Sequence, residues 1–80
     1  MSPLEELEEY DDLVEAVAKL EHKQWVHWSK SLAKDEKISK ERLERWEKLW
    51  CSYSRLPEAQ KEQDRIWAKK VLKVILNTLQ

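Results

Sequence analysis

The chain has 80 residues, of which 41% are hydrophobic and 39% are charged, with a net charge of -1. This length supports one small hydrophobic core and therefore one domain. Glycine is absent, which excludes a glycine-rich phosphate loop, and the single Cys51 excludes an internal disulfide and a multi-cysteine zinc site. No apolar run is long enough to span a membrane, and the N-terminus is acidic where a secretory signal is basic. We therefore expect no membrane partner and a reducing, cytoplasmic location.

The first predicted helix opens at Ser2, Pro3 and Glu5, which have the pattern of an N-cap, a proline at the first helical position and a capping-box glutamate. Apolar residues then recur at helical spacing to about residue 33. Three residues at 10–12 favour turns or strands, and they indicate a bend in this helix.

Two further helices follow the first. Residues 34–37 are a polar connector, after which Ser39 caps a second helix that runs to about Trp50. Pro57 then suits the first turn of a third helix that reaches about Leu79. There is no strand signal and no internal repeat. The predicted fold is therefore all-α, a compact three-helix arrangement with short loops.

The net charge conceals two parts of opposite sign. Residues 1–21 carry eight acids against Lys19 alone, whereas residues 22–80 carry fourteen bases against eight acids. We divide the single domain into an acidic part, 1–19, and the remaining helical part, 20–80. The acidic part can pair with the basic remainder within one chain or across a dimer, or the bases can attract a phosphate-bearing ligand. Because acids alternate with bases along the second helix, duplex nucleic acid is not an expected partner.

The third helix carries more apolar surface than a monomer of this size can readily bury. The excess predicts a contact between chains, for which a twofold dimer is the commonest form. A frayed, partly exposed terminus is the alternative. The two adjoining apolar stripes consist of Trp67, Val71, Val74 and Ile75, and of Leu72, Ile75, Leu76 and Leu79.

Two polar residues on the apolar face of the first helix are candidate site residues. Glu21 occupies the centre of that face, so its carboxylate needs an indole N–H, a base from the third helix or a bound ligand. His22, at the edge of the face, is typical of a hydrogen-bonded structural group. His22 and His27 are five residues apart, which turns their rings about 140° from each other on a helix, and we predict no metal site.

The five tryptophans are the most unusual feature of the composition. Their helical spacing predicts that most of them fill the core, as aromatic stripes usually do. Phenylalanine is absent, however, and this favours one or two indoles that line a cleft. No side chain lies on a recognisable nucleophile turn and Cys51 has no evident histidine partner, so we expect neither an enzyme nor a cofactor. The residues concerned are Trp25, Trp28, Trp46, Trp50 and Trp67.

Two stretches of this chain resemble the RyR domain, the repeat of ryanodine receptors that also occurs as free-standing copies in bacteria and phages. The family has a His-x-x-Trp turn on its first long helix, and His22 and Trp25 match it. It then has a Leu-Val-Pro-Tyr-x-x-Leu segment followed by a lysine and a polar pair, which Tyr53, Leu56 and Lys61 match, with Arg65 near the end. The resemblance covers about residues 20–73. This chain lacks the glycine turn of the family and has Ser52 in place of its proline.

The resemblance implies a non-catalytic helical module that binds a nucleotide-derived ligand. By analogy with free-standing copies, we expect a phage-encoded sponge that sequesters a cyclic oligonucleotide or ADP-ribose-type immune signal in the host cytoplasm. The candidate contacts are Trp25, Trp50 or Tyr53 for stacking on a base, Lys61 and Arg65 for phosphates, with Lys23 or Arg55 as further bases, and His22 or Glu21 for a ribose hydroxyl or base edge. The alternative is a helical protein–protein interaction or assembly module without a small ligand.

Overall fold

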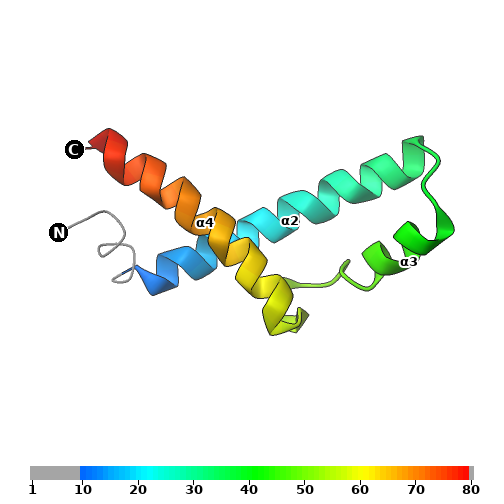
Figure 1. Cartoon of the computed structure of the whole chain (residues 1–80), viewed down its shortest axis with the longest axis horizontal. Coiled ribbons are helices and arrows are strands. Elements are labelled where there is room, and N and C mark those ends of the chain that lie inside the picture. The colour runs from blue at the N-terminus through cyan, green and yellow to red at the C-terminus, as the bar shows by residue number, and fades with distance from the viewer. Residues whose placement is uncertain (1–9, 80) are drawn as a thin grey trace.

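The computed structural model describes residues 10–79, which form three α-helices and one short 3-10 turn (Figure 1). Their order is α2 (Asp11–Asp35), α3 (Lys40–Glu47), η1 (Tyr53–Arg55) and α4 (Glu58–Leu79). The predicted all-α class with three helices is confirmed for this part of the chain. The helix start predicted at Ser2 lies outside the described residues.

Helix α2 begins at Asp11, directly after Tyr10, at the place where the sequence predicts a bend. Asp11 and Asp12 lie in its first turn, where negative charge interacts favourably with the exposed N–H groups. The helix continues without interruption past residue 20 and ends at Asp35, because Glu36 is extended. Its 25 residues make it the longest element of the described chain.

Helix α3 starts where the capping residue predicts. The Ser39 hydroxyl accepts a hydrogen bond from the Arg42 backbone N–H at 3.2 Å, which satisfies one of the unpaired donors of the first turn. The helix ends at Glu47, earlier than predicted, and an irregular segment that contains η1 leads to Pro57. Helix α4 then begins at Glu58, as the proline predicts.

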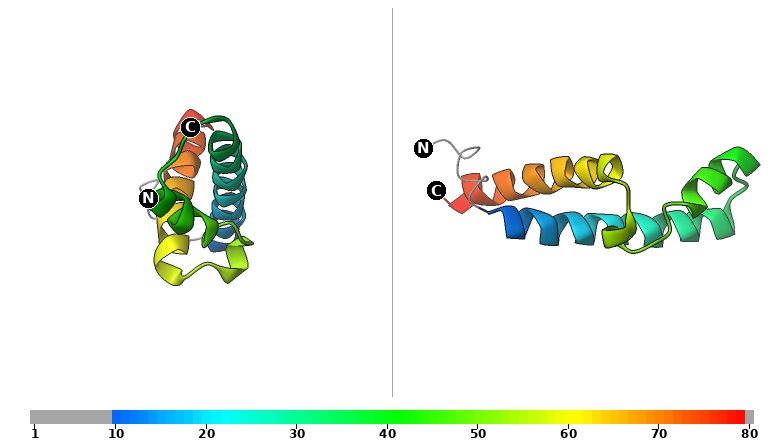
Figure 2. Two further views of the ribbon diagram at one scale, coloured as in Figure 1. Left: turned by 90° about the vertical axis from the view of Figure 1, so that its right-hand side faces the viewer. Right: turned by 90° about the horizontal axis from the view of Figure 1, so that it is seen from below.

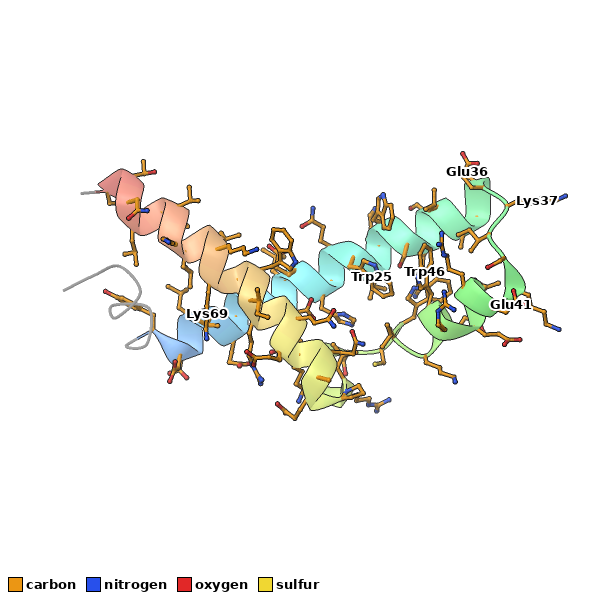
Figure 3. The ribbon with its side chains drawn as sticks, viewed as in Figure 1. Trp25, Glu36, Lys37, Glu41, Trp46 and Lys69 are labelled. Carbon is orange, nitrogen blue, oxygen red and sulfur yellow. The ribbon has the colours of Figure 1, made fainter. Side chains whose placement is uncertain are left out.

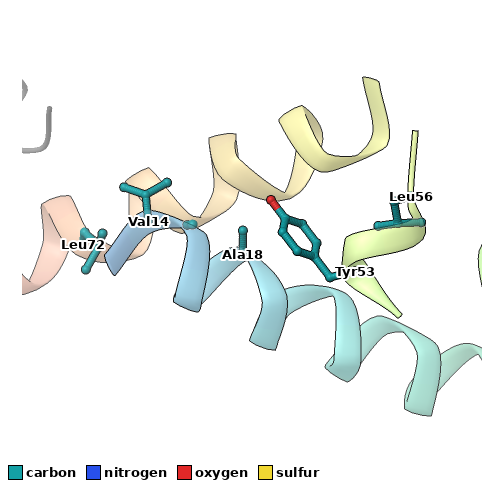
Figure 4. Close-up of a cluster of buried hydrophobic side chains, with 6 residues drawn as sticks. Val14, Ala18, Tyr53, Leu56 and Leu72 are labelled. Carbon is teal, nitrogen blue, oxygen red and sulfur yellow. The ribbon is translucent and has the colours of Figure 1, made fainter. Parts of the chain in front are cut away.

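Helices α2 and α4 run in opposite directions and cross over the N-terminal half of α2 (Figure 1). Helix α3 lies at the far end of α2, beyond the reach of α4, so the molecule is elongated with extents of 48 × 23 × 15 Å (Figures 1 and 2). The crossing is close because Ala18 and Ala68 contribute only methyl groups, and neither is exposed. The buried core consists of Val14, Ala18, Tyr53, Leu56, Ala68 and Leu72 (Figure 4).

The prediction that most tryptophans fill the core is wrong for the single chain. None of them belongs to the buried cluster, and Trp28 and Trp67 are 54% and 59% exposed. Trp67 lies on α4, and three of the other rings gather where α3 meets α2. There Trp25 and Trp46 point toward each other, with ring centres 5.9 Å apart and edge to face (Figure 3).

Parts of the two predicted apolar stripes of α4 remain exposed. Val74 is 65% exposed and Leu79 is 78% exposed, whereas Leu72, on the side that faces α2, is buried. Within residues 10–79, no helix has the length and apolar character required to cross a membrane.

Candidate functional site

His22 is a buried polar residue that contacts three segments of the described chain. Its ring is 5% exposed, and Nε2 lies 2.7 Å from the backbone carbonyl oxygen of Cys51. Because a carbonyl only accepts, Nε2 carries the hydrogen and donates it. The other ring nitrogen, Nδ1, faces Oδ2 of Asp64 at 3.9 Å, and the ring stacks on Trp25 with centres 6.1 Å apart. His22 therefore links α2 to the irregular segment and to α4.

A cavity of about 320 Å³ opens on the Asp64 side of His22. We call it the acidic cavity, because Glu21 and Asp64 are the two charged groups in its lining besides His22. Burial raises the pKa of Asp64, and so does the charge of Glu21, while His22 acts in the opposite direction. The complete lining is Glu21, His22, Trp25, Leu49, Leu56, Gln60, Gln63, Asp64 and Trp67.

A second depression of about 390 Å³ lies between α2 and the segment around Cys51. We call it the basic groove, because three lysines and two histidines line it and no carboxylate does. One of the lysines, Lys30, also lies over the Trp50 ring, with Nζ 5.7 Å from the ring centre. The complete lining is Lys19, His22, Lys23, Val26, His27, Lys30, Cys51, Ser52 and Tyr53.

A third polar group, the Glu15 cluster, joins α2, η1 and the start of α4. Its members are Glu15, Tyr53, Glu58, Glu62 and Arg65. The Tyr53 hydroxyl donates to Glu15 at 2.8 Å, and Arg65 Nε donates to the same carboxylate. Arg65 also donates to Glu58 at 3.0 Å and to Glu62 at 3.4 Å. The guanidinium of Arg65 thus faces three carboxylates of its own chain.

The pKa values in this cluster follow from these bonds. The hydrogen bond from Tyr53, and then that from Arg65, lowers the pKa of Glu15. Burial, together with the hydrogen bond to Glu15, raises the pKa of Tyr53 to about 12. The hydrogen bond to Glu15, followed by that to Glu58, raises the pKa of Arg65. At neutral pH the cluster therefore holds an ionised Glu15, a neutral Tyr53 and a charged Arg65.

Five of the seven candidate residues from the sequence fall into these three places. Glu21, His22 and Trp25 meet in the acidic cavity, whereas Tyr53 shares the basic groove with His22. Arg65 belongs to the Glu15 cluster. Their assignment to one common ligand remains a prediction.

The other two candidates are already in contact with groups of their own chain. Lys61 Nζ lies 3.6 Å from Glu58 and 5.7 Å from the centre of the Tyr53 ring. The Trp50 indole N–H donates to the hydroxyl of Ser29, which is fully buried, at 2.9 Å. A phosphate bound by Lys61 would therefore have to compete with a carboxylate.

Sequence reasoning missed Lys19 and Lys30 as site residues. Their signal was present in the spacing, since Lys19, Lys23, His27 and Lys30 follow each other at intervals of three or four and therefore share one face of α2. The opposite wall, made of Cys51, Ser52 and Tyr53, comes from a segment about thirty residues away, and no local pattern reveals it.

In the part of the chain that the structure describes, no three His, Cys, Asp or Glu side chains gather closely enough to hold a metal ion. Comparisons with family models, with curated proteins and with solved structures give no match for this chain. The resemblance to the RyR domain therefore rests on its motif residues alone.

Proposed function

We propose that this protein is a non-enzymatic binder of a nucleotide-derived anion, and that the basic groove is the binding site. The lining of the groove is the main support for this proposal, because it combines three lysines with apolar side chains and has no carboxylate. Lys19, Lys23 and Lys30 make no ion pair with any acid of residues 10–79, and among them Lys30 lies over the Trp50 ring. No carboxylate of these residues therefore competes with a ligand for the three lysines.

The phosphates of the ligand would contact the lysines of α2. Lys19 and Lys23 are about 6 Å apart along the helix axis and Lys30 is about 10 Å further along, from the rise of 1.5 Å per residue. Two or three cations at these separations suit a ligand with two phosphate groups, each bound through charge-assisted hydrogen bonds. His27, on the same face, supplies a further donor.

The base of the ligand would pack against the apolar side chains of Val26 and Cys51. Tyr53 lies in the wall beside them but is only 8% exposed, so too little of its ring is accessible for a base to stack on it. In this proposal Arg65 acts indirectly, because it and Tyr53 bind the same Glu15 carboxylate and it thereby helps to hold the Tyr53 ring in the wall of the groove.

Such a binder acts by lowering the free concentration of its ligand. The resemblance to free-standing RyR domains supports a nucleotide-derived immune signal as that ligand, of the cyclic oligonucleotide or ADP-ribose type. A phage-encoded sponge in the host cytoplasm is the biological role we propose for this activity.

The test is a titration followed by intrinsic tryptophan fluorescence and by the thermal midpoint. The panel contains cyclic di- and trinucleotides, cyclic ADP-ribose isomers, ADP-ribose and ATP. We expect one compound to saturate the wild type and raise its midpoint, because a ligand that binds only the folded state stabilises it. Lys23→Glu should weaken that binding by about tenfold or more, as expected for a charge-assisted bond replaced by repulsion.

The matched control is Lys34→Glu, which makes the same charge change in the last turn of α2, outside the groove. It should bind like the wild type. If no compound of the panel changes the fluorescence or the thermal midpoint, the groove is not a nucleotide site. The same conclusion follows if Lys23→Glu and Lys34→Glu lose affinity equally.

A second candidate function, an interaction module, is favoured by the exposed apolar side of α4. Val74, Ile75 and Leu79 are 65%, 46% and 78% exposed. We propose that this side contacts a second copy of the chain. Sedimentation of the wild type should then show a dimer that Val74→Glu dissociates, with Lys73→Glu as the exposed control on the same helix. A monomer at all concentrations would oppose this function.

A further inference from the structure

The acidic cavity has properties that a nucleotide phosphate does not explain. Its two carboxylates, Glu21 and Asp64, come from different helices and are close enough for the charge of Glu21 to raise the pKa of Asp64. Glu21 makes no side-chain hydrogen bond or ion pair with any of residues 10–79. An anion would be repelled from this cavity, whereas a cation would relieve the repulsion between the carboxylates.

The buried ring of His22 forms part of the wall of the cavity. Its side chain is 6% exposed, and Nε2 donates to the Cys51 carbonyl at 2.7 Å, which fixes the orientation of the ring. Nδ1 lies 3.9 Å from Oδ2 of Asp64, beyond hydrogen-bond distance. The imidazole therefore leaves the Asp64 carboxylate without a hydrogen bond among the described residues.

The remaining walls supply aromatic and aliphatic surface. Trp25 and Trp67 present indole rings, and Leu49 and Leu56 present apolar side chains. The electron-rich face of an indole attracts cations. This chain already contains such a contact, because Nζ of Lys70 lies 4.4 Å from the centre of the Trp67 ring.

We propose that the acidic cavity is a binding site for an organic ammonium ion that carries a small apolar or aromatic body. The ammonium N–H groups would donate to Glu21 and Asp64. The body would lie against the indoles of Trp25 and Trp67. The volume of about 320 Å³ admits a ligand of this size. The site is independent of the proposed nucleotide function, because the basic groove lies on another side of His22 and has a different lining.

The probe for this proposal is phenethylammonium, titrated by calorimetry and tryptophan fluorescence. Its neutral isostere, 2-phenylethanol, has nearly the same shape, and phenylacetate has the opposite charge. We expect saturable binding of the ammonium in the micromolar to millimolar range, at least about tenfold weaker binding of the alcohol, and none of the carboxylate. Equal binding of the ammonium and the alcohol, or no saturation by the ammonium at millimolar concentration, overturns the proposal.

Three variants locate the binding. Glu21→Gln should reduce the affinity for phenethylammonium by about tenfold or more without affecting folding, because its side chain is partly exposed and has no partner among residues 10–79. Asp64→Asn should have a similar effect. Glu44→Gln makes the same change on the exposed side of α3 and should bind like the wild type. If Glu21→Gln retains full affinity, the cavity is not the site.

A spectroscopic measurement separates this site from the groove. On addition of phenethylammonium, the ¹⁵N resonance of His22 Nδ1 should shift, because the cation binds beside it at Asp64, while the ring of the exposed His27 should not respond. Lys23→Glu should leave this shift unchanged, since it alters only the groove. A shift of both histidine rings, or of neither, contradicts a specific site at His22.

Discussion

Two carboxylates of the α2–α4 layer, Glu15 and Asp64, have opposite environments. Glu15 accepts hydrogen bonds from Tyr53 and Arg65, and its pKa is lowered. Asp64 faces a histidine at 3.9 Å and the charge of Glu21, and burial raises its pKa. The chain itself satisfies the first carboxylate but only partly compensates the second. This difference indicates which polar groups hold the fold together and which remain available to a ligand.

The two halves of the molecule differ in the same way as these two carboxylates. Near Glu15 the helices cross through alanines and the buried core lies between them. From His22 toward α3 the indoles are only half-buried and two depressions open. We infer that the crossing supplies stability and that the other half supplies binding surface. The following predictions test that division.

The largest effect is expected from overpacking the crossing. Ala68 is fully buried against α2, so Ala68→Leu has no space for its added atoms and should destabilise the fold by about 1–3 kcal/mol. For a chain of this size that lowers the thermal midpoint by roughly 4–8 °C per kcal/mol. Ala59→Leu, an exposed position of the same helix, is the control and should unfold like the wild type. Equal midpoints for the two variants would show that the crossing is not close-packed.

The two carboxylates should respond to neutralisation in opposite ways. Glu15→Gln should lower the midpoint at pH 7, because a depressed pKa means that the ionised form stabilises the fold above the unfolded-state pKa of about 4.5. This contribution is lost as the pH falls through the lower pKa of the folded state. The difference in thermal midpoint between the wild type and Glu15→Gln should therefore disappear at acidic pH. Thermal melts at several pH values measure this difference.

For Asp64 the sign is reversed. Its pKa is raised above 3.8, so protonation favours the folded state, and the ionised carboxylate costs stability once the pH rises above the folded-state pKa. Asp64→Asn should therefore have a midpoint at pH 7 equal to or above that of the wild type. If Asp64→Asn lowers the midpoint as much as Glu15→Gln does, the ionised Asp64 stabilises the fold. That result would argue against the acidic cavity as a ligand site.

A smaller loss of stability than that from overpacking the crossing is expected at Trp50. Trp50→Phe removes the indole N–H that donates to Ser29 at 2.9 Å and should cost about 0.5–1.5 kcal/mol by chemical denaturation. Trp67→Phe is the control, because the Trp67 side chain is 59% exposed and donates no hydrogen bond within residues 10–79. If both substitutions cost the same, Trp50 is not part of the structural framework.

The helices could be predicted because their signals are local. Ser39 and Pro57 mark the starts of α3 and α4, and the apolar spacing places the end of α2 at about residue 33, close to the observed Asp35. The packing could not be predicted, because periodicity does not reveal that Ala18 and Ala68 meet at the crossing. The five indoles lie outside the buried core that forms around this contact.

The candidate site could be predicted in part for the same reason. Glu21, His22 and Trp25 are neighbours on one helix, and they do share a cavity. Arg65 was expected to be a phosphate ligand, and its carboxylate partner Glu15 is 50 residues away in the sequence. A pairing over that distance depends on the antiparallel crossing of α2 and α4, which no local pattern contains.

The central claim is that the basic groove captures a nucleotide-derived anion without changing it. Equilibrium dialysis of the wild type and Lys23→Glu against the nucleotide panel, with mass spectrometry of the compound released by heating, tests it most directly. We expect the wild type to retain one compound and to release it with an unchanged mass. Lys23→Glu should fail to retain that compound. Retention of no compound, or release of one with an altered mass, would contradict the claim.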